Sequence, residues 1–89
     1  MSAPELDGLR AAIEDLDATL VSLIAERMTL ARAVGRVKAA AGQPVMDPMR
    51  ESVVVARIAA LSRDAGLPED EMRALYWRLL ALSRGVQVE

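Results

Sequence analysis

The chain has 89 residues and a formal net charge of −2, which fits one small domain with no bulk attraction to nucleic acid or acidic membranes. It contains no cysteine and no histidine, so a disulfide framework, a thiol nucleophile, a zinc site and imidazole acid–base catalysis are all unexpected, and we expect no cofactor. No apolar run is long enough to span a membrane, and the first residues lack the pattern of a signal peptide, so we expect a cytoplasmic protein.

The first predicted helix is very long and runs from about Pro4 to Ala41, with Gly42 suited to end it. At about 1.5 Å per residue it would measure roughly 55 Å. A compact chain of this size has a radius of gyration of only about 12 Å. Such a helix must project from its own subunit and needs a partner. The simplest partner is a second copy related by two-fold symmetry.

Apolar residues repeat along this helix at alternating steps of three and four, which is a heptad pattern. The seam consists of Leu6, Leu9, Ile13, Leu16, Leu20, Leu23, Leu30, Val34, Val37 and Ala41. Arg27 stands in this seam where another leucine is expected. Desolvating a guanidinium is costly unless a carboxylate or a ligand anion compensates. Three interpretations stay open: a polar residue that fixes the register, an ion pair with Glu26 or Glu14, or an anion site.

Two more basic residues on the same helix are candidates for that anion site. Lys38 follows Arg27 on the same face, about 16 Å along the axis, so the two side chains can converge on a small anion. It is also the only lysine among eleven basic residues. Arg10 lies about 25 Å before Arg27 and cannot reach the same small ligand within one subunit, but it can reach the partner's site in an antiparallel dimer. Solvated surface is the plainer interpretation of a helical arginine.

The second predicted helix follows a loop over 42–47. Asp47 is its expected N-cap, Pro48 its first residue and Asp64 its approximate end. Free backbone N–H groups at a helix N-terminus favour polar ligands, so Arg50 and Glu51 in the first turn are site candidates or simply surface charges.

Gly66 ends the second helix, and the third begins near Pro68 and runs towards Val86. Ser83 and Gln87 lie one turn apart at its end, where either the helix frays or a polar pocket is lined. With no strand, repeat or linker in view, we predict a single all-α domain of three helices over residues 1–89.

Taken together, these residues resemble the all-helical chorismate mutase family over nearly the whole chain. No motif is specific alone, and the resemblance rests on their order: Leu9-Arg10-x-x-Ile13-x-x-Leu16-Asp17, Leu23-Ile24-Ala25-Glu26-Arg27, Val34-Gly35-Arg36-Val37-Lys38, Pro44-Val45-Met46-Asp47-Pro48-Met49-Arg50-Glu51, and finally Ser83 with Gln87. The fold that this resemblance implies is an intertwined two-fold homodimer, a six-helix bundle of three-helix subunits. That agrees with the length of the first helix.

The resemblance implies an isomerase that rearranges chorismate to prephenate on the shikimate route to phenylalanine and tyrosine. The rearrangement is intramolecular and needs no nucleophile, metal or proton transfer, in agreement with the composition. The protein would select the reactive conformer and stabilise charge on the breaking ether oxygen. The resemblance assigns one substrate carboxylate to Arg27 and the other to Arg10 of the partner subunit. It assigns the ether oxygen to Lys38 and Gln87, and the ring hydroxyl to Glu51 and the backbone near Asp47. Ser83 and Arg50 would complete the polar wall.

Other functions fit the same residues. Isochorismate pyruvate lyase and aminodeoxychorismate mutase resemble this chain at Arg27 and Lys38, although the carboxylate of Glu51 favours chorismate. In a non-catalytic helical dimerisation module, Arg27 would only fix the register. Some short relatives are activated by docking onto the enzyme that starts the shikimate pathway. Gly85 weakens the last turn here, which prompts the same expectation for this chain.

Overall fold

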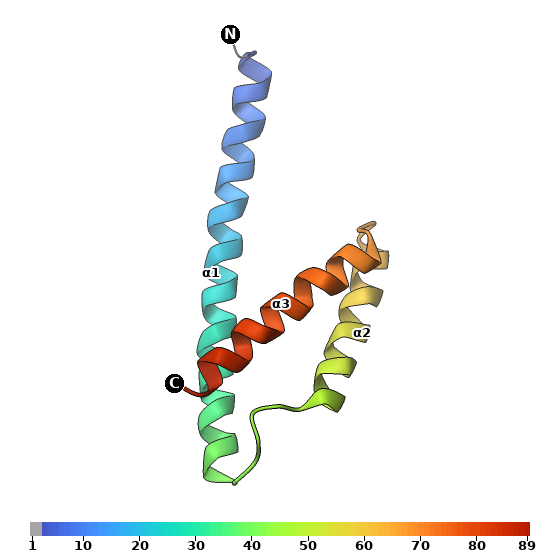
Figure 1. Ribbon diagram of the computed structural model, residues 1–89. Helices are drawn as coiled ribbons and strands as arrows, with labels where there is room; N and C mark the ends of the chain where they lie inside the picture. Colours follow the sequence, from blue (N-terminus) through green and yellow to red (C-terminus); the bar gives the residue numbers. More distant parts are fainter. Residues whose placement is uncertain (1–2) are drawn as a thin grey trace.

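The computed structural model describes residues 3–89, which form three helices and no strand. Helix α1 spans Pro4–Ala40, α2 spans Pro48–Asp64 and α3 spans Glu69–Gln87. In Figure 1, α3 crosses the C-terminal half of α1, and α2 lies beside the other end of α3. The prediction of an all-α chain of three helices is therefore confirmed. The predicted domain also includes residues 1 and 2, which lie outside the described residues.

Each turn between helices is made by a glycine with a left-handed backbone: φ is 68° at Gly42 and 73° at Gly66. After α1, the N–H of Gly42 donates to the carbonyl of Ala39 at 3.2 Å and that of Gln43 donates to Lys38 at 2.8 Å. This pair of bonds satisfies carbonyls that the helix end leaves open, and glycine adopts the required φ without steric cost. The two glycines therefore fix where the chain leaves α1 and α2.

Helix α2 begins at a side-chain cap. Asp47 Oδ1 accepts a hydrogen bond from the backbone N–H of Arg50 at 3.1 Å, and Pro48 takes the first helical position. We expect Asp47→Ala to lower the free energy of unfolding by about 1 kcal/mol, because an N–H of the first turn loses its acceptor. Urea denaturation at matched protein concentration measures this loss. Asp47→Asn keeps an acceptor and should stay near wild type; equal losses in both variants would contradict a capping role.

The core of the subunit is thin. Where α3 packs on α1, the buried apolar residues are Met28, Ala31 and Val86, with Leu79 against them. Further along, Val55, Ala59 and Leu80 are also buried. No side chain among residues 3–89 is completely buried. A single subunit of this kind gains little hydrophobic stabilisation, because most of its apolar surface remains in water.

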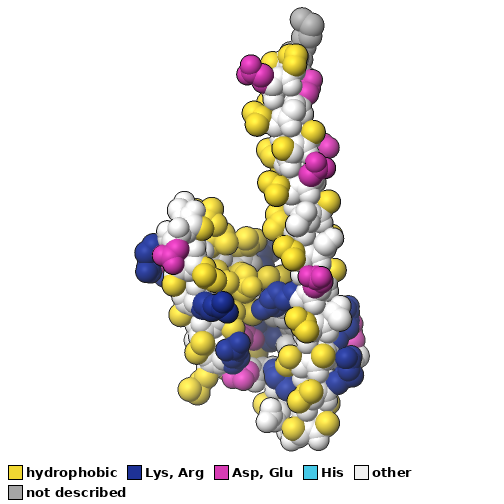
Figure 2. Space-filling model, turned by 180° about the vertical axis from the view of Figure 1, so that it is seen from behind, with side chains coloured by type: hydrophobic (Ala, Val, Ile, Leu, Met, Phe, Trp, Pro, Cys, Tyr) yellow, Lys and Arg dark blue, Asp and Glu magenta, His cyan; other side chains and the backbone are white. Residues whose placement is uncertain are grey.

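The heptad seam is not the face by which α1 packs on its own subunit. The buried residues of α1 are Met28, Ala31 and Gly35, on a neighbouring face. Six large seam residues in the N-terminal half keep exposed fractions of 41–64%: Leu6, Leu9, Ile13, Leu16, Leu20 and Leu23. Figure 2 shows apolar side chains following one another along this projecting part of the helix, and the chain measures 59 × 26 × 17 Å. The contacts among residues 3–89 therefore leave this part of the seam exposed.

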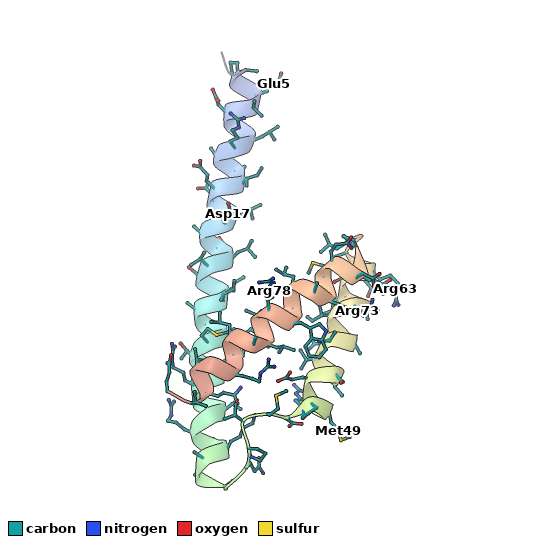
Figure 3. All side chains as sticks on the ribbon, viewed as in Figure 1. Glu5, Asp17, Met49, Arg63, Arg73 and Arg78 are labelled. Carbon is teal, nitrogen blue, oxygen red and sulfur yellow. The ribbon has the colours of Figure 1, made fainter. Side chains whose placement is uncertain are left out.

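Exposed charges occupy the corner between α2 and α3 (Figure 3). Arg63 Nη2 donates to Glu69 Oε1 at 2.9 Å, and Arg73 lies 3.7 Å from the same carboxylate oxygen. The hydrogen bond from Arg63 lowers the pKa of Glu69, and the same bond raises the pKa of Arg63. Any stability from this pair is present above the ordinary pKa of a glutamate and is lost as the pH falls through the lowered value. Arg63 is exposed and Glu69 is half-buried, so water still screens the pair in part.

Within residues 3–89, none of the helices combines the length and apolar character that a membrane crossing requires.

Candidate functional site

A pocket of about 300 Å³ lies where α1, the loop before α2, α2 and α3 meet. That volume is at the lower end of the range for small-molecule sites, about 300–1,000 Å³. Seven of the eight predicted site residues line it: Arg27, Lys38, Asp47, Arg50, Glu51, Ser83 and Gln87. Apolar side chains complete the wall, among them Leu30, Val34, Val54 and Leu80. Figure 2 shows basic side chains on both sides of the hollow between α1 and the other two helices.

Arg27 enters this pocket from α1 and is held by α3. Its Nη1 donates to Ser83 Oγ, and Ser83 Oγ donates in turn to the carbonyl of Leu79 at 3.0 Å. The guanidinium carbon also lies 5.4 Å from the centroid of the Tyr76 ring. Among the ion pairs of the described residues, none joins Arg27 to a carboxylate, so the interpretation of an ion pair with Glu26 or Glu14 is wrong. Most guanidinium donors stay available to an anion.

Lys38 is fixed by two acceptors from different elements. Its Nζ donates to the carbonyl of Val45 at 2.8 Å and to Gln87 Oε1 at 2.9 Å. An ammonium has three N–H donors, so one remains for a ligand. The Gln87 amide uses its oxygen on Lys38, which leaves its Nε2 free to donate as well. One ammonium donor and one amide donor therefore stand side by side at the end of the pocket.

The end of α3 is packed rather than frayed. The helix continues to Gln87, one residue beyond the predicted end, and Val86 is buried against α1. Arg32 also holds the chain just after the helix: its Nε lies 2.6 Å from Oε2 of Glu89, two residues after Gln87. The alternative of a fraying last turn is therefore wrong, since contacts with α1 stabilise it.

Gly35, which was not among the predicted site residues, makes this packing possible. A Cβ placed on Gly35 would lie 2.3 Å from the backbone oxygen of Gln87 and 2.7 Å from its Cα. Only a residue without a side chain allows α3 to approach α1 so closely. The signal was a glycine inside a helix, which lowers helix stability and therefore has a packing or functional reason. Gly35 thus sets the position of Gln87.

Glu51 forms an ion pair with a second residue that was not among the predicted site residues. Its Oε1 accepts from Arg84 Nη1 at 2.6 Å, with the two side chains 12% and 29% exposed. Sequence reasoning missed Arg84, because the pair joins the first turn of α2 to the last turns of α3 and no local pattern indicates it. Asp47 Oδ1 is engaged as the cap of α2, while Arg50 lines the pocket with an exposed side chain.

Arg10 is the one predicted site residue that this pocket does not include. It lies on the exposed half of α1, about 25 Å along the axis from Arg27. Glu5 and Asp17, labelled in Figure 3, mark the same projecting part of the helix. Within one subunit, Arg10 and the pocket are separate.

The charges of the pocket fit an anionic ligand. Three cationic side chains line it, and of its two carboxylates, Glu51 is paired with Arg84, which is not among the lining residues. No group of histidine, cysteine, aspartate or glutamate side chains within residues 3–89 is placed to hold a metal ion. The hydroxyl hydrogen of Ser83 points to a backbone carbonyl and not to a base. The arrangement can bind a carboxylate and stabilise negative charge at a second point near Lys38.

Comparisons with known proteins agree with this chemistry. Residues 9–88 match the family described as chorismate mutase type II. The chain is 39% identical over 72 residues to a 4-amino-4-deoxychorismate mutase of Streptomyces venezuelae, covering 81% of this chain and 70% of the relative. It is 30% identical over 83 residues to a chorismate mutase of Methanocaldococcus jannaschii, covering 93% and 84%. It is 34% identical over 84 residues to an intracellular chorismate mutase of Mycolicibacterium smegmatis, covering 94% and 75%.

Proposed function

The chain belongs to the chorismate mutase type II family, and we propose that it rearranges chorismate to prephenate in the pocket between its three helices. The observation that carries this proposal is the pair formed by Lys38 and Gln87, 2.9 Å apart, in a pocket that also presents Arg27. Chorismate is a dicarboxylate with an ether oxygen, and these residues supply donors for both kinds of group. No other reactant is needed, because the rearrangement is intramolecular.

Binding of the substrate dianion is the first task of the pocket. Arg27 is fixed by Ser83 and has free donors, so it suits one carboxylate of chorismate in a bidentate contact. We assign the second carboxylate to Arg10 of the partner subunit. Two anchored carboxylates hold the flexible enolpyruvyl group over the ring, in the conformer in which the new C–C bond can form.

Stabilisation of the transition state is the second task. As the C–O bond breaks and the C–C bond forms, negative charge develops on the ether oxygen. The remaining N–H of Lys38 and the free Nε2 of Gln87 are the donors for this oxygen. Val45 and the packed end of α3 hold both groups in advance, so little reorganisation is needed at the moment of reaction.

An intertwined two-fold homodimer is the assembly that we propose for this chain. The exposed apolar seam of α1 supports it, because an apolar surface of this extent on a small domain marks an interaction site. In an antiparallel pair of α1 helices the seams would bury one another and form a six-helix bundle. Each Arg10 would then lie near the partner's pocket.

Mixing two inactive variants tests the shared site. Arg10→Ala and Lys38→Ala should each be nearly inactive alone. When they are co-refolded in equal amounts, half of the dimers are mixed, and each mixed dimer contains one intact site. Activity should recover to about a quarter of the wild-type value. Absence of recovery, with mixed dimers detected by mass spectrometry, would place Arg10 outside the partner's site.

Mutase activity on 4-amino-4-deoxychorismate is the second candidate function. The Streptomyces relative named for this activity favours it. That substrate carries an amine where chorismate carries a hydroxyl. A carboxylate can accept a hydrogen bond from either group, so Glu51 alone does not decide between them.

The decisive assay follows the loss of chorismate absorbance with the purified chain and identifies the product. Formation of prephenate supports the proposed function. The same assay is run in parallel with 4-amino-4-deoxychorismate and with isochorismate. Turnover of only the amino substrate would select the second candidate, and release of pyruvate from only isochorismate would select the lyase. Turnover of none of the three would leave a helical dimerisation module.

Activation by the enzyme that starts the shikimate pathway stays a prediction. In the same assay, a rise in kcat/KM on adding that synthase would support it. We also propose a cytoplasmic location, which the name of the mycolicibacterial relative, an intracellular enzyme, supports.

A further inference from the structure

The ion pair between Glu51 and Arg84 lies at the boundary of the pocket. Glu51 lines the pocket, whereas Arg84 is not among the lining residues and pairs with Glu51. The distance from Nη1 to Oε1 is 2.6 Å, and only 12% of the Glu51 side chain is exposed. Arg84 therefore acts on a ligand only through Glu51.

This contact has a geometric and an electrostatic consequence. Arg84 engages Oε1, which orients the carboxylate and leaves Oε2 as an acceptor for a ligand. Arg84 also cancels the charge of the carboxylate. An unpaired buried carboxylate attracts any cation strongly, because the interior screens charges poorly. A carboxylate paired with an arginine still accepts a hydrogen bond, but it no longer favours a cationic donor over a neutral one.

The two candidate substrates differ in this property. The ring substituent of chorismate is a neutral hydroxyl, and that of the amino analogue is an aliphatic amine, which is protonated at neutral pH. We infer that Arg84, through its ion pair with Glu51, makes the pocket select a hydroxyl and reject an ammonium at this ring position. The inference rests on the proposed function and makes Arg84 a positioning residue that determines specificity.

The test replaces Arg84 by glutamine, which keeps a donor for Glu51 and removes the charge. For wild type and Arg84→Gln, kcat/KM is measured with chorismate and with 4-amino-4-deoxychorismate. We expect wild type to prefer chorismate. In Arg84→Gln, the ratio of amino substrate to chorismate should rise at least about tenfold, which corresponds to about 1.4 kcal/mol. The rise should come mainly from a lower KM for the amino substrate, because the change acts on binding of its ammonium.

Three matched variants separate this role from a structural one. Arg84→Lys keeps the charge and should keep the wild-type ratio. Arg73→Gln removes another arginine of α3, one that pairs with Glu69 and Asp70 away from the pocket, and should leave the ratio unchanged. In a Glu51→Gln background, Arg84→Gln should no longer change the ratio, because position 51 then has no carboxylate whose charge the loss of Arg84 could leave unpaired.

The outcomes distinguish this inference from the proposed function. If wild type converts chorismate but folded Arg84→Gln keeps the wild-type ratio, the specificity role is wrong and the function stands. A wild-type preference for the amino substrate, with Arg84 in place, also overturns the role. Turnover of neither substrate by wild type removes both. Circular dichroism monitors folding, and Arg84→Met, which keeps the apolar stem, replaces Arg84→Gln if that variant does not fold.

Discussion

Lys38→Ala is expected to lower kcat by at least 10²–10³-fold, corresponding to about 2.7–4 kcal/mol, the typical cost of removing one donor to charge that develops in a transition state. The ammonium of Lys38 is held by Val45 and Gln87, and its third N–H is the proposed donor to the ether oxygen. Alanine removes that donor and also the contact that orients the Gln87 amide. Steady-state turnover of chorismate measures the loss.

The control for Lys38 is an arginine two positions earlier. Arg36 is exposed on α1 and does not line the pocket, so Arg36→Ala should keep wild-type turnover. Lys38→Arg should also lose activity, since a planar guanidinium is larger and presents its donors differently from a compact ammonium. Near-normal turnover in Lys38→Ala, with wild-type helical content, would refute the proposed function of this pocket.

Gly35→Ala should be as damaging as loss of Gln87 itself, although no atom of Gly35 is proposed to touch substrate. The added Cβ would lie within 2.3–2.9 Å of the oxygen, Cα and carbonyl carbon of Gln87. These are backbone atoms, so the end of α3 must move away from α1. The Gln87 amide then leaves Lys38, and we expect kcat to fall about 10²-fold or more. Because Val86 would be displaced as well, the free energy of unfolding should fall by about 1–3 kcal/mol.

A second glycine provides the control for Gly35. Gly85 lies in α3, and a Cβ there meets nothing within 4 Å. Gly85→Ala should therefore stabilise the protein by up to about 1 kcal/mol through helix propensity and should keep its activity. Turnover and urea denaturation of both variants give the comparison. If Gly35→Ala behaves like Gly85→Ala, the close approach of the two helices does not position Gln87.

The exposed seam of α1 links these expectations to assembly. One subunit contains Arg27, Lys38, Glu51 and Gln87 in a single pocket, but Arg10 lies far from it. The exposed N-terminal part of the seam lies on the same half of α1 as Arg10. The same two-fold pairing that would bury the seam would bring a further cation, Arg10, to each pocket, so stability and catalysis would depend on one interface.

Much of the fold was readable from the sequence, because the signals are local. Pro48 and Asp47 start α2, and Gly42 and Gly66 end the helices before them, through contacts among residues only a few positions apart. The heptad repeat indicated the length of α1, because the apolar pattern continues along nearly the whole helix. Helical periodicity alone also put Arg27 and Lys38 on one face, since the backbone hydrogen bonds of a helix fix that angle.

Only the tertiary structure decided which face of α1 meets α3 and which polar groups pair across the pocket. Arg27 and Ser83 are 56 positions apart, Lys38 and Gln87 are 49 apart, and Glu51 and Arg84 are 33 apart. Such contacts depend on where two helices cross, and no local pattern specifies a crossing point. The roles of Gly35 and Arg84 arise there: one permits the helices to approach, and the other neutralises a carboxylate that the sequence showed only as a first-turn charge.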